Sequence, residues 1–406
     1  MQTIIAVADG MADLPLAQLG GHTPMQAANT PAIDALVPFA RLGRVRTIPH
    51  GIPPGSDTAF LSILGFDPLC DYTGRAPLEA AALGVPIEAD DAFLRINFIA
   101  ITPDAAWEDA DILSHSGGGL THEEGHELCA AVNADAGCIA LMESLGFSLH
   151  EGTGYRHILR IRGGAAAAKR FETTPPHDVL DQPLRDHLPR GTGIEGLMAF
   201  MREASRVLAA HPMNIGRPQP ANCAFAWGQG GAPKVRPLGQ AFPGLRGTCV
   251  TAVPLVHGVC VCRGMERIDV PGATGELDTN YEGKAAATLA ALRDGYDLIL
   301  VHVEAPDEEG HAGRVEGKVE AIRRFDERIV APIAAAMRAM DTPVQLLIMP
   351  DHATPLSTRT HSADPVPFLL WNNQATIEAP GAVYDDVTDL PLVDEGWRLF
   401  GEILRG

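Results

Sequence analysis

Three short apolar stretches of the sequence each run into an aspartate. The stretches and the polar residues that follow them are Ile4 to Ala8 with Asp9, Leu298 to Val303 with Asp307 and His311, and Val344 to Met349 with Asp351, His352 and His361. A single aspartate after a strand is often only a helix cap or a turn former. Three such aspartates accompanied by three histidines are better explained by metal binding.

Together with Ser56, these side chains supply three carboxylates, three imidazoles and one hydroxyl. This set is too large for one tetrahedral ion and is sufficient for two. A mixed nitrogen and oxygen set without thiolate suits Mn²⁺, Zn²⁺, Co²⁺ or Fe²⁺ better than Mg²⁺ alone. Paired divalent ions are used in phosphoryl transfer, and metal coordination activates a serine hydroxyl that is otherwise a poor nucleophile.

Ser56 follows a break in the chain at Pro53, Pro54 and Gly55 and precedes a helix-like apolar period that begins at Thr58. A serine at a helix N-terminus lies where amide N–H groups and the helix dipole favour a phosphate. An N-cap serine has the same location. The local pattern leaves both roles open.

The elements that must position these residues are those of a mostly parallel α/β sheet. Short apolar runs bounded by turn residues are typical of strands covered on both faces, and ligands gather beyond the carboxyl ends of such strands. Further strands are expected at these ranges: Arg44 to Ile48, Leu94 to Ile101, His157 to Ile161, Ala224 to Trp227, Thr248 to Val253 and Val366 to Trp371.

Helices are predicted where capping boxes and amphipathic periods occur. Capping boxes begin at Thr121 and Thr279, and Ile194 to His211 has a long amphipathic pattern. The low-complexity run Gly163 to Lys169 is predicted to be a loop, and Cys260 and Cys262 lie in a strand-like apolar stretch. A charge-paired helix should follow His311 and run to about residue 340.

The middle third of the chain lacks strands that end in an aspartate and histidine. We therefore predict a metal-binding core formed by residues 1–75 and 240–406, with an inserted smaller α+β domain at residues 76–239. Glycines and prolines near both junctions, including Gly74, Gly228 and Gly230, could act as hinges for an inserted lid domain.

Composition limits the class of function. A net charge of −20 argues against nucleic acid as a partner, because phosphate backbones require clusters of Lys and Arg. The seven cysteines show no C-x-x-C spacing and are expected to be reduced, which favours a cytoplasmic location. No apolar run approaches the ~18 residues that cross a bilayer, so no membrane role is expected. We find no nucleotide-binding glycine motif, and a homo-oligomer is left open.

Several motifs also resemble those of a known family. They include VADGMAD (7–13), PPGSDTAFLSILGFDP (53–68), YTGRAPLEAAALG (72–84), PGATGELDTNYEGK (271–284), HVEAPDEEGH (302–311) and DHATPLSTRTHSADPVPF (351–368). By these motifs the chain resembles the cofactor-independent phosphoglycerate mutases of the archaeal type, within the alkaline phosphatase superfamily. The resemblance implies an alkaline-phosphatase-like fold and interconversion of 3-phosphoglycerate and 2-phosphoglycerate through a phosphorylated Ser56.

The resemblance also implies a distribution of ligands. One metal would be held by Asp9, Ser56, Asp351 and His352, and the other by Asp307, His311 and His361. Mn²⁺ is the ion we expect, with Zn²⁺, Co²⁺ and Mg²⁺ as alternatives. In place of a cysteine and a D-Y-S-A-G-like segment typical of relatives, the middle domain has RINFIAI and LSHSGGGL. A bacterial branch of the same family has been proposed to act as homoserine kinase, so the resemblance leaves that activity as the alternative function.

A phosphorylated substrate needs positive partners, which are scarce in this acidic chain. We expect them to come from both domains, and the candidates are Lys284 in the core, Arg75 at the junction, and His115, Arg156 and His157 in the insert. Lys284 is notable because a cation near a helix N-terminus is slightly unfavourable. A solvated surface lysine is the alternative for that position.

Overall fold

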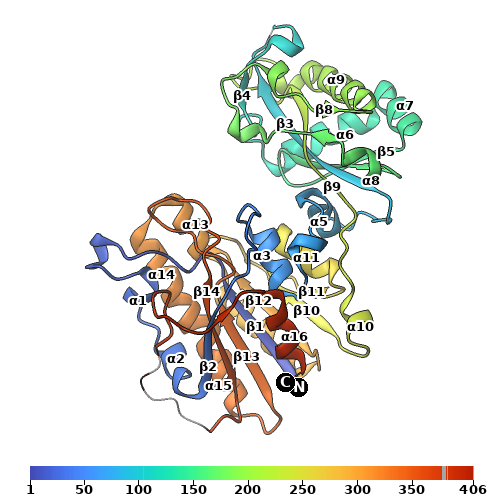
Figure 1. The fold of residues 1–406 in the computed structure, drawn as a ribbon. Helices are drawn as coiled ribbons and strands as arrows, with labels where there is room; N and C mark the ends of the chain where they lie inside the picture. Colours follow the sequence, from blue (N-terminus) through green and yellow to red (C-terminus); the bar gives the residue numbers. More distant parts are fainter. Residues whose placement is uncertain (104, 377–380, 382, 406) are drawn as a thin grey trace. The chain divides into compact units, whose positions relative to one another are not determined.

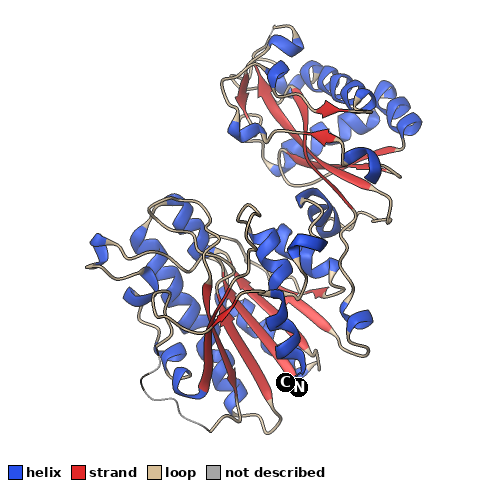
Figure 2. Cartoon of the chain, in the orientation of Figure 1, coloured by secondary structure: helices blue, strands red, loops and turns tan. Residues whose placement is uncertain are grey.

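The computed structural model describes residues 1–103, 105–376, 381 and 383–405, and these residues form two compact units. The first unit contains residues 1–72 and 234–406, and the second contains residues 73–233. Figures 1 and 2 show that both units combine a sheet with helices. The predicted α/β class is therefore confirmed.

The first unit is built on an eight-stranded sheet in the order β11-β10-β12-β1-β13-β14-β2-β15. The strands are β1 (Gln2–Ala8), β2 (Ala40–Val45), β10 (Gly247–Val250), β11 (Glu266–Arg267), β12 (Leu298–Val303), β13 (Val344–Met349), β14 (Val366–Asn372) and β15 (Leu392–Val393). β1 lies between β12 and β13 and is parallel to both. β14 is antiparallel to its two neighbours, β13 and β2, so the sheet is mostly parallel, as predicted.

Helices lie on both sides of this sheet (Figure 1). They are α1 (Pro24–Ala27), α2 (Pro31–Asp34), α3 (Ser56–Ile63), α4 (Pro68–Asp71), α10 (Leu238–Ala241), α11 (Pro254–Cys262), α12 (Tyr281–Arg293), α13 (Ala305–Ala312), α14 (Val315–Phe325), α15 (Ala331–Arg338) and α16 (Trp397–Arg405). β1, β12 and β13 are almost entirely buried, which explains why their sequences are continuous apolar runs rather than alternating ones.

The second unit contains a five-stranded antiparallel sheet with the order β4-β3-β6-β5, in which β9 also pairs with β3. Its strands are β3 (Ala92–Ile101), β4 (Ile112–Ser114), β5 (Phe147–His150), β6 (Arg156–Ile161) and β9 (Cys223–Gly231), with a separate pair β7 (Phe171–Glu172) and β8 (Arg190–Gly191). Its helices are α5 (Arg75–Ala82), α6 (His122–Ala134), α7 (Ala136–Leu145), α8 (Ala165–Ala168) and α9 (Glu195–Ala210). The core joins residues of β3 and β9 to residues of α6 and α9.

Several local expectations differ from the structure. Cys260 and Cys262 lie on α11 rather than on a strand, and residues 165–168 form a turn of helix instead of a loop. The helix predicted at Thr279 is capped by Asn280, because the Thr279 hydroxyl bonds to the backbone of Thr274. The helix expected after His311 is interrupted at Gly313, which has a φ of 69°, and later contains a π-helical turn at Asp326–Val330.

Two other local expectations, the capping box at Thr121 and the reduced state of the cysteines, are confirmed. Thr121 and Glu124 form the predicted capping box at the start of α6. All seven cysteines are free thiols. Among the described helices, none alone has the length and apolar composition to cross a bilayer, and α6 and α7 meet those criteria only as a pair bent by 73°.

Candidate metal centre

Asp9, Asp351 and His352 form a buried group at the carboxyl ends of β1 and β13. All three side chains are fully buried, and each offers a ligand atom within 4.8 Å of the others. Asp351 Oδ1 accepts hydrogen bonds from the backbone N–H groups of Gly10 (3.1 Å) and His352 (2.9 Å). These two bonds fix the carboxylate and leave its other oxygen, Oδ2, directed into the group.

The two carboxylates in this group are only partly satisfied by protein atoms. Among the described residues, Asp9 Oδ1 and Asp351 Oδ2 are buried and have no hydrogen-bond partner. Burial and the neighbouring carboxylate of Asp351 raise the pKa of Asp9 well above its usual range, and burial raises the pKa of Asp351 to about 6. Burial lowers the pKa of His352 to about 3, so its imidazole is neutral. Unpartnered carboxylate oxygens beside a neutral imidazole fit a divalent cation.

Asp307, His311 and His361 form a second group. Asp307 and His311 are four residues apart on α13, which places both side chains on one helix face. His311 Nε2 lies 3.1 Å from Asp307 Oδ2 and 2.9 Å from His361 Nε2, while His361 Nε2 lies 3.5 Å from Asp307 Oδ1. Hydrogen bonding to Asp307 raises the pKa of His311 to about 9. Three ligand atoms that converge in this way fit a second cation.

The two groups are adjacent. The rings of His352 and His361 have centroids 4.1 Å apart, and the Thr354 hydroxyl contacts both Asp307 Oδ1 and His352 Nδ1. Gly10 makes this approach possible because it has a φ of 58° and a Cβ there would lie 2.6 Å from Asp307 Oδ1. The six predicted aspartate and histidine ligands therefore lie together.

Ser56 joins this cluster from α3. It is the first residue of the helix, and Gly55 occupies the N-cap position. The Ser56 hydroxyl therefore does not cap the helix and instead lies 3.2 Å from His352 Nε2. This location brings together a serine hydroxyl, a candidate ligand group and the positive end of a helix dipole.

His302 and Glu304 belong to the same region and were not predicted from the sequence. His302 Nε2 lies 2.8 Å from Asp9 Oδ2 and 3.3 Å from Glu304 Oε2, and His302 Nδ1 lies 2.9 Å from the Thr251 hydroxyl. The signal that could have identified His302 is a polar residue inside the otherwise apolar strand β12.

Lys284 lies next to His302 and belongs to the first half of α12. It is fully buried, so the alternative of a solvated surface lysine is wrong. Its ammonium donates to the carbonyl oxygen of His302 at 3.0 Å. Burial lowers the pKa of Lys284 to about 8. The structure thus holds a cation of reduced basicity next to the residue that contacts Asp9.

The other four predicted substrate-binding residues belong to the second unit. Arg75 pairs with Glu79 at 2.9 Å, and the exposed Arg156 lies over the Tyr155 ring at 5.1 Å. His157 is buried against Phe98, and burial lowers its pKa to about 3, so it is neutral near pH 7 and cannot supply the expected positive charge. The pKa of His115 is lowered by burial as well.

His115 is part of an aromatic and basic cluster that includes residues not predicted from the sequence. The ring centroid of His177 lies 6.0 Å from that of His115 and 5.4 Å from that of Trp227. The guanidinium of Arg95 lies 4.2 Å from the Trp227 ring centroid and pairs with Glu79 at 3.0 Å. Arg95 was missed because it lies within the apolar pattern of β3.

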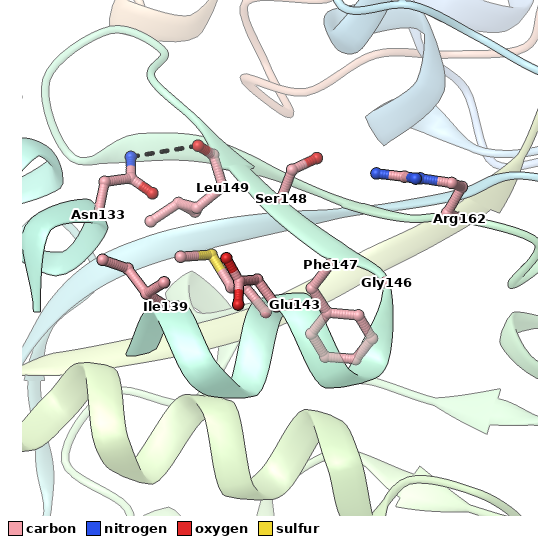
Figure 3. A pocket seen from close by; sticks show the side chains of 9 residues that line it. Asn133, Ile139, Glu143, Gly146, Phe147, Ser148, Leu149 and Arg162 are labelled. Carbon is pink, nitrogen blue, oxygen red and sulfur yellow. Dashed lines mark hydrogen bonds between the residues drawn. The ribbon is translucent and has the colours of Figure 1, made fainter. Parts of the chain in front are cut away.

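A separate hollow of about 260 Å³ lies in the second unit between α7 and β5 (Figure 3). Asn133 donates to the carbonyl oxygen of Leu149 at 3.2 Å beside it, and Arg162 lines its other side. None of the predicted site residues lines this hollow.

The chain is similar to several known proteins. Residues 39–214 match a family model described as 2,3-bisphosphoglycerate-independent phosphoglycerate mutase. A Geobacter sulfurreducens protein named a probable member of that class is 41% identical over 411 residues and covers 100% of both chains. A 2,3-bisphosphoglycerate-independent phosphoglycerate mutase of Methanosarcina barkeri is 41% identical and covers 95% of this chain and 94% of its own.

Solved structures share the fold. A protein from Pyrococcus horikoshii is 25% identical, covers 100% of this chain and 97% of its own, and has a TM-score of 0.78. A cofactor-independent phosphoglycerate mutase from Thermoplasma acidophilum covers 99% of both chains with a TM-score of 0.66 at 23% identity.

Proposed function

The chain belongs to the 2,3-bisphosphoglycerate-independent phosphoglycerate mutase family, and from this premise we propose that it interconverts 3-phosphoglycerate and 2-phosphoglycerate through phosphorylated Ser56. The observation that carries the proposal is the 3.2 Å approach of the Ser56 hydroxyl to His352 Nε2, beside two converging groups of ligand atoms. An isomerase of this kind needs a nucleophile that accepts a phosphoryl group and returns it.

The ligand groups are assigned to two divalent ions. One would be held by Asp9, Ser56, Asp351 and His352, and the other by Asp307, His311 and His361. We propose Mn²⁺ for both, because mixed carboxylate and imidazole ligands suit it. When bound, these ions neutralise charge on the phosphoryl oxygens and lower the pKa of the serine hydroxyl.

The reaction then follows from the chain's own groups. Ser56 Oγ loses its proton and forms a bond to phosphorus, while the bond between phosphorus and the substrate oxygen breaks and that oxygen gains a proton. The glycerate turns while it stays bound, and its other hydroxyl attacks the phosphoserine in the reverse sense. Ser56 recovers its proton, so atoms and charge balance over the cycle. The α3 dipole favours the phosphoserine dianion in the intermediate.

The decisive assay supplies 3-phosphoglycerate and Mn²⁺ in one reaction and ATP, Mg²⁺ and homoserine in another. We expect 2-phosphoglycerate in the first reaction and no phosphohomoserine in the second. The family relationship disfavours the kinase alternative. If the protein instead consumes ATP with homoserine and shows no mutase turnover, its function is that of a homoserine kinase and the mutase proposal is wrong.

Lys284 should give the mutase reaction a dependence on alkaline pH. Its folded pKa, about 8, is below its usual value, so the ammonium is present below pH 8 and is lost as pH rises through that value. If the ammonium assists an anionic substrate, kcat/KM should fall above pH 8, because kcat/KM reports the ionisation of the free enzyme. Lys284→Met should lower kcat/KM and abolish that pH limb.

Stability gives the control for this variant. A buried lysine with a lowered pKa destabilises the fold below pH 8, and this penalty decreases as pH rises from about 8 towards the unfolded value. Lys284→Met should therefore melt at the same temperature as wild type at pH 7, or higher. If the pH profile of the variant is the same as that of wild type, Lys284 does not assist the substrate.

The second unit is proposed to act as a lid that retains the phosphoryl group. A phosphoserine exposed to water would be hydrolysed, so closure must precede chemistry. Pro233 precedes Lys234, where the chain re-enters the first unit. Pro233→Gly loosens this junction and should raise the ratio of inorganic phosphate to 2-phosphoglycerate at least about threefold. Pro86→Gly, on an exposed loop of the second unit, is the matched control and should leave the ratio unchanged.

A further inference from the structure

A cavity of about 710 Å³ lies in the first unit, apart from the residues of the metal centre. Its walls come from the end of α3, the segment after Pro233, the end of α11 and helix α16. Lining residues that matter here are Phe66, Lys234, Arg236, Phe242, Arg263 and Phe400. This volume is in the range of pockets that hold small organic ligands.

The cavity is positively charged in a chain with a net charge of −20. Lys234, Arg236 and Arg263 form no ion pair with any residue that the structure describes. The other charged lining residues are largely compensated: Arg398 pairs with Glu395 at 2.5 Å, and Glu402 pairs with Arg41 at 2.9 Å. Among the described residues that line the cavity, Asp71 alone remains to oppose the three cations.

Arg263 is the buried cation among the residues that line the cavity. It is 3% exposed, and its guanidinium lies 4.4 Å from the Phe66 ring centroid and 5.0 Å from that of Phe400. Nη1 donates to the Arg236 carbonyl oxygen at 2.6 Å, whereas Nε is buried with no partner among the described residues. A buried donor without a partner is costly. The aromatic rings hold this guanidinium in place, and a bound anion would compensate it.

We propose that this cavity binds a small organic phosphate. Three cations around one cavity match the multiple charge of a phosphoryl group better than that of a single carboxylate, and a guanidinium presents paired donors to phosphate oxygens. This site is separate from the metal centre, and its occupancy does not depend on the mutase reaction.

Occupancy would act on the chain segment that joins the two units. Lys234 and Arg236 lie one and three residues after Pro233, where the chain leaves the second unit. Both side chains are exposed and lack an ion-pair partner in the described structure, so a bound anion would add a restraint to this segment. The expected consequence is slower amide exchange in residues 234–242.

The test uses the full-length, metal-loaded protein with inorganic phosphate as the probe. Hydrogen exchange read by mass spectrometry should slow in peptides that cover residues 234–242 and Arg263. The double variant Lys234→Gln/Arg236→Gln should lose this protection, and the Kd for the phosphate that causes it should rise at least about tenfold, as expected for lost charge-assisted bonds. Arg293→Gln removes one exposed cation outside the cavity and should behave as wild type.

Two results would overturn the proposal. One is wild-type protein in which excess phosphate slows exchange only at the metal centre. The other is a double variant with the wild-type response in residues 234–242. Acetate is the specificity probe, and equal protection by acetate at the same concentration would overturn the assignment to phosphate. Both variants are on the surface, so unchanged melting temperatures confirm that folding is intact.

Discussion

Replacing Ser56 with alanine is expected to lower mutase turnover by at least about a thousandfold, because removal of a covalent nucleophile typically costs that much or more. The hydroxyl lies 3.2 Å from His352 Nε2, and Ser56 is the first residue of α3. Six ligand side chains remain in the variant, so the loss of metal should be much smaller than the loss of turnover. Initial rates and metal content should be measured on the same preparation.

Ser62→Ala is the matched control for this experiment. Ser62 lies on the same helix, is fully buried, and donates to the carbonyl oxygen of Thr47 rather than to the metal centre. The substitution should cost about 1 kcal/mol of stability, the value of one hydrogen bond, and should leave turnover near wild type. A Ser56→Ala protein that keeps a tenth of wild-type activity would exclude Ser56 as the nucleophile.

Metal removal is expected to abolish turnover, and each chain should bind two ions when reconstituted with Mn²⁺. Asp351→Asn should reduce the stoichiometry to one, because the Asp307, His311 and His361 group is independent of Asp351. Activity should fall by more than the roughly 10- to 100-fold that the loss of an outer-shell partner costs. Elemental analysis of the dialysed protein measures the stoichiometry directly.

The same substitution should not destabilise the metal-free protein, unlike an ordinary substitution in the core. Asp9 and Asp351 repel each other in the metal-free protein, which contributes to the raised pKa of Asp9. Asp351→Asn relieves this repulsion, so the metal-free variant should melt no lower than metal-free wild type.

The control for the metal stoichiometry is Glu308→Gln. Glu308 is next to Asp307 on α13 but outside the ligand groups, so this variant should retain two ions. One ion or none in wild type would contradict the two-metal centre.

The sequence alone was sufficient to predict the strands that carry the ligands. β12 and β13 have the predicted limits because both are buried on two faces, and continuous apolar runs of this length are a strong signal when turn residues bound them. Asp307 and His311 were predicted from their position just beyond the carboxyl end of the apolar run Leu298 to Val303. The convergence of Asp9 with Asp351 could be anticipated only from the rule that parallel strands deliver ligands to one edge.

The failures have specific physical causes. Cys260 and Cys262 were assigned to a strand because a short apolar run does not distinguish a buried helix from a strand, although Pro254 at the first turn was a helix signal. His302 and Glu304 were missed because their role depends on Asp9, which is almost 300 positions away along the chain. His157 was treated as a cation, and only the packing around it shows that burial keeps it neutral.

The position of β1 in the sheet has a consequence for biosynthesis. β1 leaves the ribosome long before its two neighbours, β12 and β13, which begin at Leu298 and Val344. The second unit is continuous from residue 73 to residue 233 and can fold as soon as it emerges, since domains generally fold as units during synthesis. Asp9 therefore has no partners until β12 and β13 have been synthesised. The nascent chain has no assembled metal centre, and premature termination before β13 yields a product that cannot form one.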